Sequence, residues 1–146
     1  AQRDLTVIQE TWKYLHRNKK STVFKKSNMA KNVLIVDDSL YMRTVIKDAL
    51  ESNGFKVVGQ AANGEEAIDL AFELQPDIIT LDNILPDMIG TDILKVYTEE
   101  KLVSKVIMIS AVGQESVIQE GLSLGAKAYI VKPFTSDQLM IEVNKL

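Results

Sequence analysis

The chain has 146 residues, 46% of them hydrophobic and 25% charged, which suits one globular domain and excludes wholesale disorder or a fibrous repeat. It contains no cysteine and a single histidine, His16, which excludes a disulfide framework, a thiol nucleophile and a histidine-rich zinc site. No apolar run approaches the roughly 20 residues needed to cross a bilayer, so we predict a cytoplasmic protein without a membrane span.

The first 28 residues differ in charge from the rest of the chain. They hold seven basic and two acidic residues (net +5), whereas the remaining 118 hold 10 basic and 18 acidic residues (net −8). Helical spacing of Leu5, Ile8, Trp12 and Leu15 predicts one amphipathic helix. We therefore expect a basic helical extension or appended segment over 1–28 and a separate domain over 29–146. The acidic domain is not expected to bind nucleic acid, because phosphate backbones attract positive patches.

From residue 31 onward, short apolar runs alternate with amphipathic stretches. The runs are rich in β-branched residues and predict strands buried on both faces: Val33–Val36, Val57–Val58 with its flanks, Ile78–Leu81, Val106–Ile109 and Ala128–Val131. The other stretches predict helices: Leu40–Ser52, Gly64–Leu74, Gly90–Thr98, Gln114–Leu124 and Ser136–Asn144. This alternation predicts an α/β fold, a doubly wound five-stranded parallel sheet with helices on both faces.

Polar side chains follow four of the predicted strands, at the point where each strand ends. Asp37 and Asp38 follow the first strand, and Asp82 follows the third. Ser110 follows the fourth strand and Lys132 follows the fifth. The carboxyl ends of parallel strands share one edge, where ligand sites form, so we expect these side chains to converge. One polar residue after a strand usually only begins a loop, whereas four strands with the same feature indicate a site.

The residue types at this edge indicate phosphoryl chemistry. Three clustered carboxylates repel one another unless a cation intervenes, and Mg²⁺ prefers a few carboxylate oxygens plus water. Lys132 then supplies a positive charge for an anion bound next to the metal. Asp82 stands alone after the middle strand and is the predicted nucleophile, which would form an aspartyl phosphate.

Four motifs occur in order at a spacing typical of one family: Val36-Asp37-Asp38-Ser39, Leu81-Asp82-Asn83-Ile84-Leu85-Pro86, Ile109-Ser110-Ala111 and Tyr129-Ile130-Val131-Lys132-Pro133-Phe134. On these motifs residues 30–146 resemble the receiver domain of bacterial and archaeal response regulators, particularly the stand-alone chemotaxis regulators. The resemblance implies a flavodoxin-like sheet with strand order 2-1-3-4-5. That order is taken from the family by analogy and not from the residues.

The resemblance also implies a set of metal ligands. Asp38 and Asp82 would bind Mg²⁺ directly, and Asp37 would bind it through water. The backbone carbonyl of Ile84 would complete the protein ligands. Asp82 would be the phosphoacceptor.

The remaining motif residues would hold the phosphoryl group and report its presence. Lys132 and Ser110 would bind phosphoryl oxygens, next to the backbone N–H of Ala111. Tyr129 would be an aromatic switch that turns inward when Ser110 is drawn to the phosphoryl group. The peptide bond between Lys132 and Pro133 would be cis, as it is in the family.

The function implied is that of a two-component receiver. A sensor histidine kinase would donate the phosphoryl group, and a downstream target, such as a flagellar or archaellar motor protein or an adaptor, would dock on the switched face. A separate phosphatase is a possible third partner. Because the chain ends directly after the last predicted helix, we expect a stand-alone protein. We expect it to be a phosphoacceptor and not an enzyme, with self-phosphorylation and slow self-dephosphorylation as its only reactions.

Two departures and three alternatives accompany this interpretation. Ile89 stands where the family usually has an aspartate, and Ile84 and Val112 are apolar where many relatives have polar side chains. The first alternative is a Mg²⁺-dependent phosphatase or mutase, which usually carries a second aspartate at the position of Ile84. The others are a receiver excised from a longer regulator and a pseudo-receiver used only for binding; the complete acidic set speaks against the last.

Overall fold

The computed structural model describes residues 30–146, in which five strands alternate with five helices. The strands are β1 (Asn32–Val36), β2 (Lys56–Ala61), β3 (Ile78–Leu81), β4 (Lys105–Ser110) and β5 (Ala128–Val131). The helices are α3 (Leu40–Glu51), α4 (Gly64–Leu74), α5 (Gly90–Glu99), α6 (Glu115–Ser123) and α7 (Ser136–Val143). Each predicted element is present. The helix predicted within residues 1–28 and the boundary before Met29 lie outside the described residues and stay predictions.

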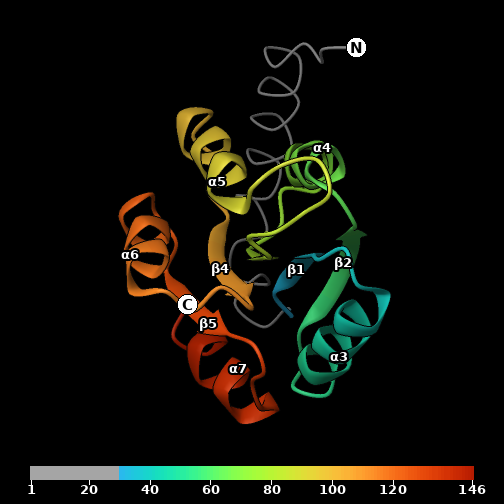
Figure 1. The fold of residues 1–146 in the computed structure, drawn as a ribbon. Coiled ribbons are helices and arrows are strands. Elements are labelled where there is room, and N and C mark those ends of the chain that lie inside the picture. Colours follow the sequence, from blue (N-terminus) through green and yellow to red (C-terminus); the bar gives the residue numbers. More distant parts are fainter. Residues whose placement is uncertain (1–29) are drawn as a thin grey trace. The chain divides into compact units, whose positions relative to one another are not determined.

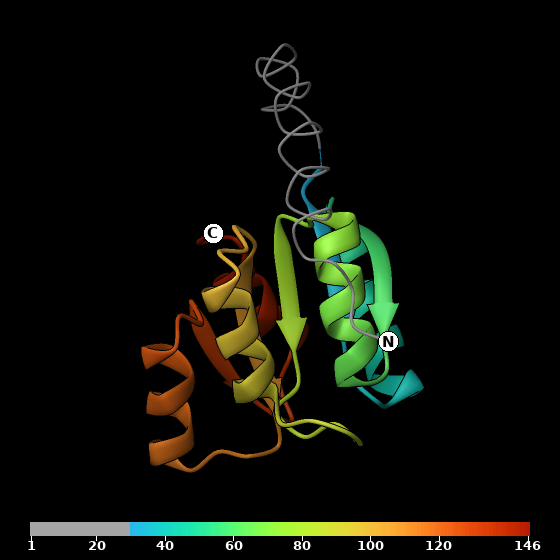
Figure 2. The same cartoon turned by 90° about the horizontal axis from the view of Figure 1, so that it is seen from above.

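The sheet has the strand order β2-β1-β3-β4-β5, and every neighbouring pair is parallel, which confirms the predicted topology. Helices α3 and α7 contact each other on one face, while α4, α5 and α6 succeed one another on the opposite face (Figures 1 and 2). The chain changes direction across the sheet between β1 and β3. In open parallel sheets, the crevice at the carboxyl ends of such strands is where ligands bind.

The core follows from strands that are covered on both faces. All four residues of β3 are buried, and on the face under α3 and α7 Val33 and Ile35 of β1 pack with Leu50 and Leu139. Thr80, a polar residue of β3, is buried with these apolar side chains. Thr80 is 1% exposed, and its hydroxyl has no hydrogen-bond partner within the part of the chain that the structure describes. Side chains two positions apart share a face of a strand, so the side chain of Thr80 lies on the same face as that of Asp82.

The helix ends have the polar and glycine residues that favour them. The side chains of Ser39, Asn63 and Thr135 accept hydrogen bonds from first-turn N–H groups and begin α3, α4 and α7. Gly54 and Gly125, which the sequence places at helix ends, have φ of +90° and +114°, values that glycine adopts without strain. Among the described residues, no helix has the length and apolarity needed to cross a membrane.

Candidate functional site: an acidic pocket at the sheet edge

Three carboxylates meet at the carboxyl ends of β1 and β3, as the sequence predicts. Asp37 and Asp38 follow β1 and Asp82 follows β3, its neighbour in the sheet. Each offers a carboxylate oxygen, and these three oxygens lie within 4.8 Å of one another. Asp37 and Asp82 are buried, whereas Asp38 is exposed. The pocket is therefore closed on the sheet side and open to solvent at Asp38, and such a donor set could hold a metal ion.

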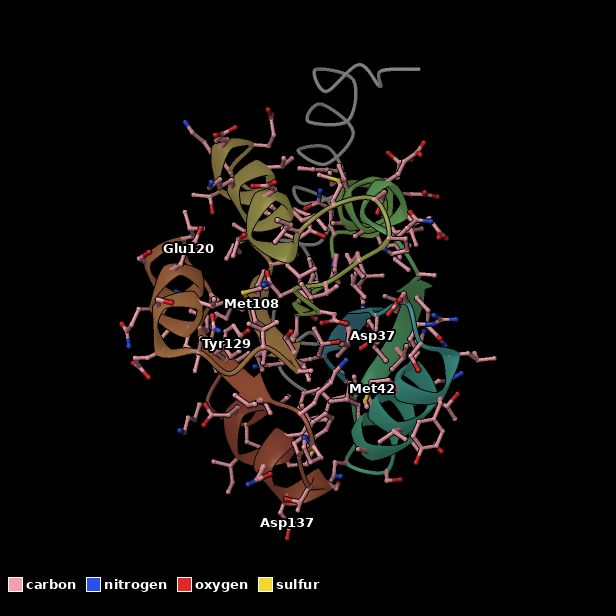
Figure 3. The ribbon with its side chains drawn as sticks, in the orientation of Figure 1. Asp37, Met42, Met108, Glu120, Tyr129 and Asp137 are labelled. Atoms are coloured by element: carbon pink, nitrogen blue, oxygen red, sulfur yellow. The ribbon has the colours of Figure 1, made fainter. Side chains whose placement is uncertain are left out.

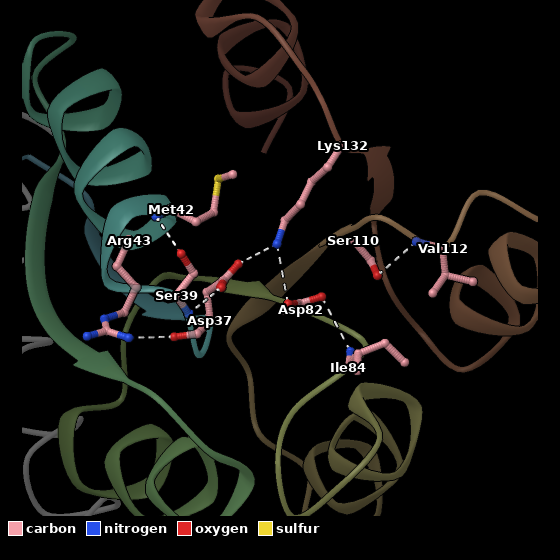
Figure 4. A network of polar contacts seen from close by, with 9 residues as sticks. All are labelled: Asp37, Ser39, Met42, Arg43, Asp82, Ile84, Ser110, Val112 and Lys132. Atoms are coloured by element: carbon pink, nitrogen blue, oxygen red, sulfur yellow. Dashed lines mark hydrogen bonds and ion pairs between the residues drawn. The ribbon is translucent and has the colours of Figure 1, made fainter.

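Lys132 reaches this pocket from the end of β5, two strands away from β3. Its ammonium nitrogen Nζ lies 2.6 Å from Oδ2 of Asp37 and 3.3 Å from Oδ2 of Asp82 (Figure 4). The ammonium group thus compensates the two buried carboxylates in this structure. The peptide bond that follows, between Lys132 and Pro133, is cis as expected.

The burial of these groups shifts their proton affinities. Burial raises the pKa of Asp82 and the charge of Asp37 adds to this, while the charge of Lys132 opposes it without cancelling it. For Lys132, burial alone would lower the pKa. The hydrogen bond to Asp37 and the charges of both carboxylates outweigh burial, so the pKa of Lys132 is raised. Lys132 is consequently a permanent cation at neutral pH.

The backbone around Asp37 is fixed on several sides. Its N–H donates to the carbonyl of Ala61 at 3.0 Å, and its Oδ1 accepts from the N–H of Ser39 at 2.9 Å. Its carbonyl oxygen accepts from Nη1 of Arg43, a residue of α3, at 2.7 Å. Arg43 was not among the predicted site residues, because nothing in its spacing distinguishes it from a solvated cation on a helix.

The loop after Asp82 is a tight hairpin. The N–H of Ile84 donates to Oδ1 of Asp82 at 3.3 Å, and Ile84 forms an isolated antiparallel bridge with Ile89. At the base of the hairpin, the N–H of Gly90 donates to the carbonyl of Asn83 at 2.7 Å. A Cβ on Gly90 would lie 2.5 Å from the carbonyl oxygen of Asp82, so only glycine allows this approach. Ile84 is thereby held beside Asp82, and the role of its carbonyl as a metal ligand stays a prediction.

Two further side chains of this hairpin, which sequence reasoning missed, fix it to its surroundings. Both oxygens of Asp87 accept from the first N–H groups of α4, those of Gly64 at 2.7 Å and Glu65 at 3.1 Å. The bond from Gly64 is the main reason why the pKa of Asp87 is lowered. Oδ1 of the buried Asn83 accepts from the N–H of Thr91 at 3.2 Å, so α5 receives its cap from outside the helix. This explains why α5 begins normally although Ile89, at its N-cap, makes no side-chain cap bond.

The predicted switch residues form a second, neutral group at the end of β4. Ser110 is buried, and its hydroxyl accepts from the N–H of Val112 at 3.2 Å. The hydroxyl of Tyr129, from β5, donates to the carbonyl of the same Val112 at 2.6 Å. Figure 3 shows Tyr129 near Met108, and a Cβ on Gly121 would lie 3.4 Å from the tyrosine ring. Burial raises the pKa of Tyr129. Ala111 is exposed and is the first residue of the loop that connects β4 to α6.

The fold and site agree with the comparison with protein families. Residues 33–144 match the model of the response regulator receiver domain, and the chain belongs to this family. It is a receiver domain of two-component signalling systems.

Within the family, the chain is similar to chemotaxis proteins. It is 43% identical to the chemotaxis protein CheY of Bacillus subtilis (strain 168) over 117 residues, 80% of this chain and 98% of that protein. It is 42% identical to CheY of Thermotoga maritima over 118 residues, with 81% and 98% covered. A crystal structure of a CheX–CheY–BeF3–Mg²⁺ complex from Borrelia burgdorferi matches with a TM-score of 0.79 and 36% identity, covering 83% of this chain and 92% of that one.

Proposed function

We propose that this receiver accepts a phosphoryl group on Asp82 from the phosphohistidine of a sensor kinase, with Mg²⁺ bound at the acidic pocket. The observation that carries the proposal is the convergence of three carboxylate oxygens within 4.8 Å with the ammonium group of Lys132 between two of them. Hard oxygen donors, one of them open to solvent, suit a cation that keeps several of its waters. The solved relative from Borrelia, whose description includes Mg²⁺, supports the same cation.

In the proposed ligand set, Asp38 and Asp82 hold Mg²⁺ directly, Asp37 through water and Ile84 through its carbonyl. When bound, Mg²⁺ supplies charge neutralisation to the phosphoryl oxygens and the carboxylates. Lys132 must then leave Asp37, to which it now donates at 2.6 Å, and its ammonium group becomes free to bind a phosphoryl oxygen.

The chemical step is a transfer between two nucleophiles. A carboxylate oxygen of Asp82 attacks phosphorus, a P–O bond forms, and the P–N bond to the kinase imidazole breaks. The imidazole leaves and takes up a proton from solvent. Lys132, the hydroxyl of Ser110 and the N–H of Ala111 are the groups that this chain offers to the three phosphoryl oxygens.

The proposed output is a change of the face formed by β5, α6 and α7. A groove of about 340 Å³ on this face is lined by Tyr129, Val131 and Ile141 together with polar residues of α7, and the side chains of Val131 and Ile141 are exposed. When a phosphoryl oxygen takes the hydroxyl of Ser110, the N–H of Val112 loses its acceptor, and the tyrosine bonded to the carbonyl of the same residue is free to adjust. The population of docking-competent molecules then shifts.

The proposed partners follow from the relatives. Their name as chemotaxis proteins supports a role in motility, with a histidine kinase upstream and a motor or adaptor protein downstream. The complex from Borrelia pairs its CheY with CheX, so we propose that a CheX-like protein binds this chain as well. A separate phosphatase is a further proposed partner. The location proposed is the cytoplasm.

We further propose that the chain is a phosphoacceptor and not an enzyme acting on external substrates. A phosphatase or mutase of similar chemistry usually carries a second aspartate, as acid or base, two positions after its nucleophile, and in this chain that position is Ile84. A receiver that is part of a longer regulator stays an alternative for the natural protein.

The test is incubation of the full chain with acetyl phosphate and Mg²⁺, followed by intact mass. We expect a gain of one phosphoryl group that depends on Mg²⁺ and is absent from Asp82→Asn. Glu73→Gln, an exposed acid on α4, is the matched control and is expected to label like the wild type. No label on the wild type, or an equal label on Asp82→Asn, would refute the proposed function.

A further inference from the structure

Arg43 joins the acidic loop to the edge of the sheet. Its Nη1 donates to the carbonyl oxygen of Asp37 at 2.7 Å (Figure 4). Its Nε donates to Oε1 of Gln60 in β2 at 3.0 Å. The two donors belong to one planar guanidinium group, so the bonds fix each other's direction. Gln60 in turn lies on the strand that pairs with β1.

The peptide that Arg43 holds is the joint between two of the three carboxylates. The carbonyl of Asp37 belongs to the peptide bond whose nitrogen is that of Asp38, so its orientation sets the direction in which the exposed Asp38 side chain leaves the loop. Lys132 also contacts Asp37, but it donates to the carboxylate, the group that a bound cation would need. The bond from Arg43 goes to the backbone and does not compete with a cation.

The positive charge of Arg43 is unfavourable both for the helix that carries it and for a cation bound in the neighbouring pocket. It is the fourth residue of α3, near the helix N-terminus, where the helix dipole disfavours a cation. It also has the same sign as a metal ion in the neighbouring pocket, so that its field alone would weaken cation binding. Helix stability therefore does not account for an arginine at this position. The nearby carboxylates attract its charge, but both of its hydrogen bonds go to neutral acceptors, a backbone carbonyl and an amide oxygen, so the geometry of these bonds distinguishes it from a simple counter-ion.

We propose that Arg43 is a positioning residue for the cation site, which orients the Asp37–Asp38 peptide so that the three carboxylates converge. This inference rests on the proposed function, since it takes Mg²⁺ as the ion that the pocket binds. It predicts a result whose sign differs from that of simple electrostatics: removal of this positive charge should weaken the binding of a positive ion.

The experiment measures Mg²⁺ affinity by calorimetric titration of the full chain and, separately, thermal unfolding without Mg²⁺. Loss of an outer partner of a metal ligand typically costs 10- to 100-fold in metal affinity. We expect Arg43→Gln to weaken Mg²⁺ binding by about 10-fold, and Arg43→Lys, which keeps the charge but not the two-pronged geometry, by a similar factor. Gln60→Met, which changes no charge, should weaken it by about three-fold, because one of the two anchors remains.

Two controls separate positioning from charge and from general damage. Lys47→Gln removes the same charge one turn further along α3, from a residue that is not among the contacts of Asp37 in residues 30–146, and should leave affinity unchanged or slightly improved. Hydrogen exchange without Mg²⁺ should show faster exchange at the N–H of Ser39, which donates to Asp37, in Arg43→Gln but not in Lys47→Gln.

The outcomes distinguish the two proposals. If the wild type binds Mg²⁺ and the Arg43 variants bind it equally or more tightly, the positioning role is wrong and the proposed function stands. If Arg43→Gln loses thermal stability without Mg²⁺ but keeps its affinity, Arg43 only satisfies a buried carbonyl and the inference is again wrong. If the wild type binds no Mg²⁺ at millimolar concentration, the proposed function and the inference both fail. Should Arg43→Gln not fold, Arg43→Lys and Gln60→Met decide the matter.

Discussion

The two groups of residues at the carboxyl end of the sheet are held in different ways. Asp37, Asp82 and Lys132 are joined by ion pairs at 2.6 and 3.3 Å, and their backbones are fixed by the neighbouring strands. Ser110 and Tyr129 are instead both bonded to the backbone of Val112, by neutral hydrogen bonds of 3.2 Å from its N–H and 2.6 Å to its carbonyl. The comparison teaches that in the acidic group the backbone is fixed, while the ion pairs of the side chains can be exchanged for other charged partners. The neutral group depends on the position of one loop residue, Val112.

The largest expected effect concerns the acidic group. Asp38→Ala should reduce Mg²⁺ affinity and phosphoryl acceptance by roughly 100-fold or more, since a direct ligand is worth at least as much as an outer partner. Stability without Mg²⁺ should rise or stay unchanged, because one of three repelling carboxylates is gone while the ion pairs of Lys132 remain. Calorimetric Mg²⁺ titration and thermal unfolding measure the two quantities. A clear loss of stability without Mg²⁺ would contradict the assignment of the acidic pocket.

The second prediction concerns the lifetime of the phosphorylated state. Ile84 and Val112, where the family resemblance leads us to expect polar side chains, are apolar and offer no hydrogen bond that could hold a water in line with phosphorus. Correct placement or proton transfer is worth on the order of 100-fold in rate, so Ile84→Asn combined with Val112→Glu should shorten the phosphoryl lifetime by at least about 10-fold. The loss of label after removal of acetyl phosphate, in saturating Mg²⁺, gives both lifetimes. An equal or shorter lifetime in the wild type would show that the two residues only pack.

The third prediction compares a glycine at the base of the hairpin after Asp82 with a glycine of the loop after Ser110. Gly90→Ala should destabilise the fold by about 1–3 kcal/mol, because the new Cβ would lie 2.5 Å from the backbone oxygen of Asp82, which cannot yield. Gly113→Ala should change stability by less than about 1 kcal/mol, because its Cβ would lie 3.0 Å from a methyl group of Val131, which can rotate. Urea unfolding of both variants tests the comparison directly. Equal losses would mean that the loop after Ser110 is as constrained as the hairpin after Asp82.

The smallest effect of this series is expected in the neutral group. Tyr129→Phe removes the hydroxyl that donates to Val112 and should cost about 0.5–1.5 kcal/mol of unfolding free energy. Phosphoryl acceptance by Asp82 should remain within about two-fold, because no ion pair or ligand is touched. Intact mass after acetyl phosphate treatment and urea unfolding measure these outcomes. A failure to accept the phosphoryl group would place Tyr129 in the reacting site and not in its readout.

The sequence allowed much of the fold to be predicted because its strands are buried on both faces. Runs such as Ile78–Leu81 contain almost no polar residue, and the polar residues that interrupt the pattern begin the loops. The convergence of Asp37, Asp82 and Lys132 followed from the rule that parallel strands end at one edge. Family resemblance supplied the strand order, which the structure confirms.

What could not be predicted depends on side chains that act far from their place in the sequence. Asp87 caps α4, which begins 23 residues earlier, and no local spacing indicates that pairing. Asn83 caps α5 by accepting from Thr91, eight residues further along the chain, and Arg43 donates both to a backbone carbonyl, that of Asp37, and to the side chain of Gln60, 17 residues away. These contacts are decided by rotamers and by the path of loops, whereas a sequence pattern reports mainly which face of an element is apolar.

The hydroxyl of Thr80, which has no hydrogen-bond partner among residues 30–146, makes the domain easier to engineer. A buried polar group without a hydrogen bond costs free energy, and its replacement by an apolar group of the same shape removes that cost. Thr80→Val should therefore raise the unfolding free energy by about 1 kcal/mol, measurable as a higher midpoint in urea. Such a background would give destabilising variants the margin to remain folded during an assay. It would also widen the range of substitutions that a directed-evolution experiment on this receiver could tolerate.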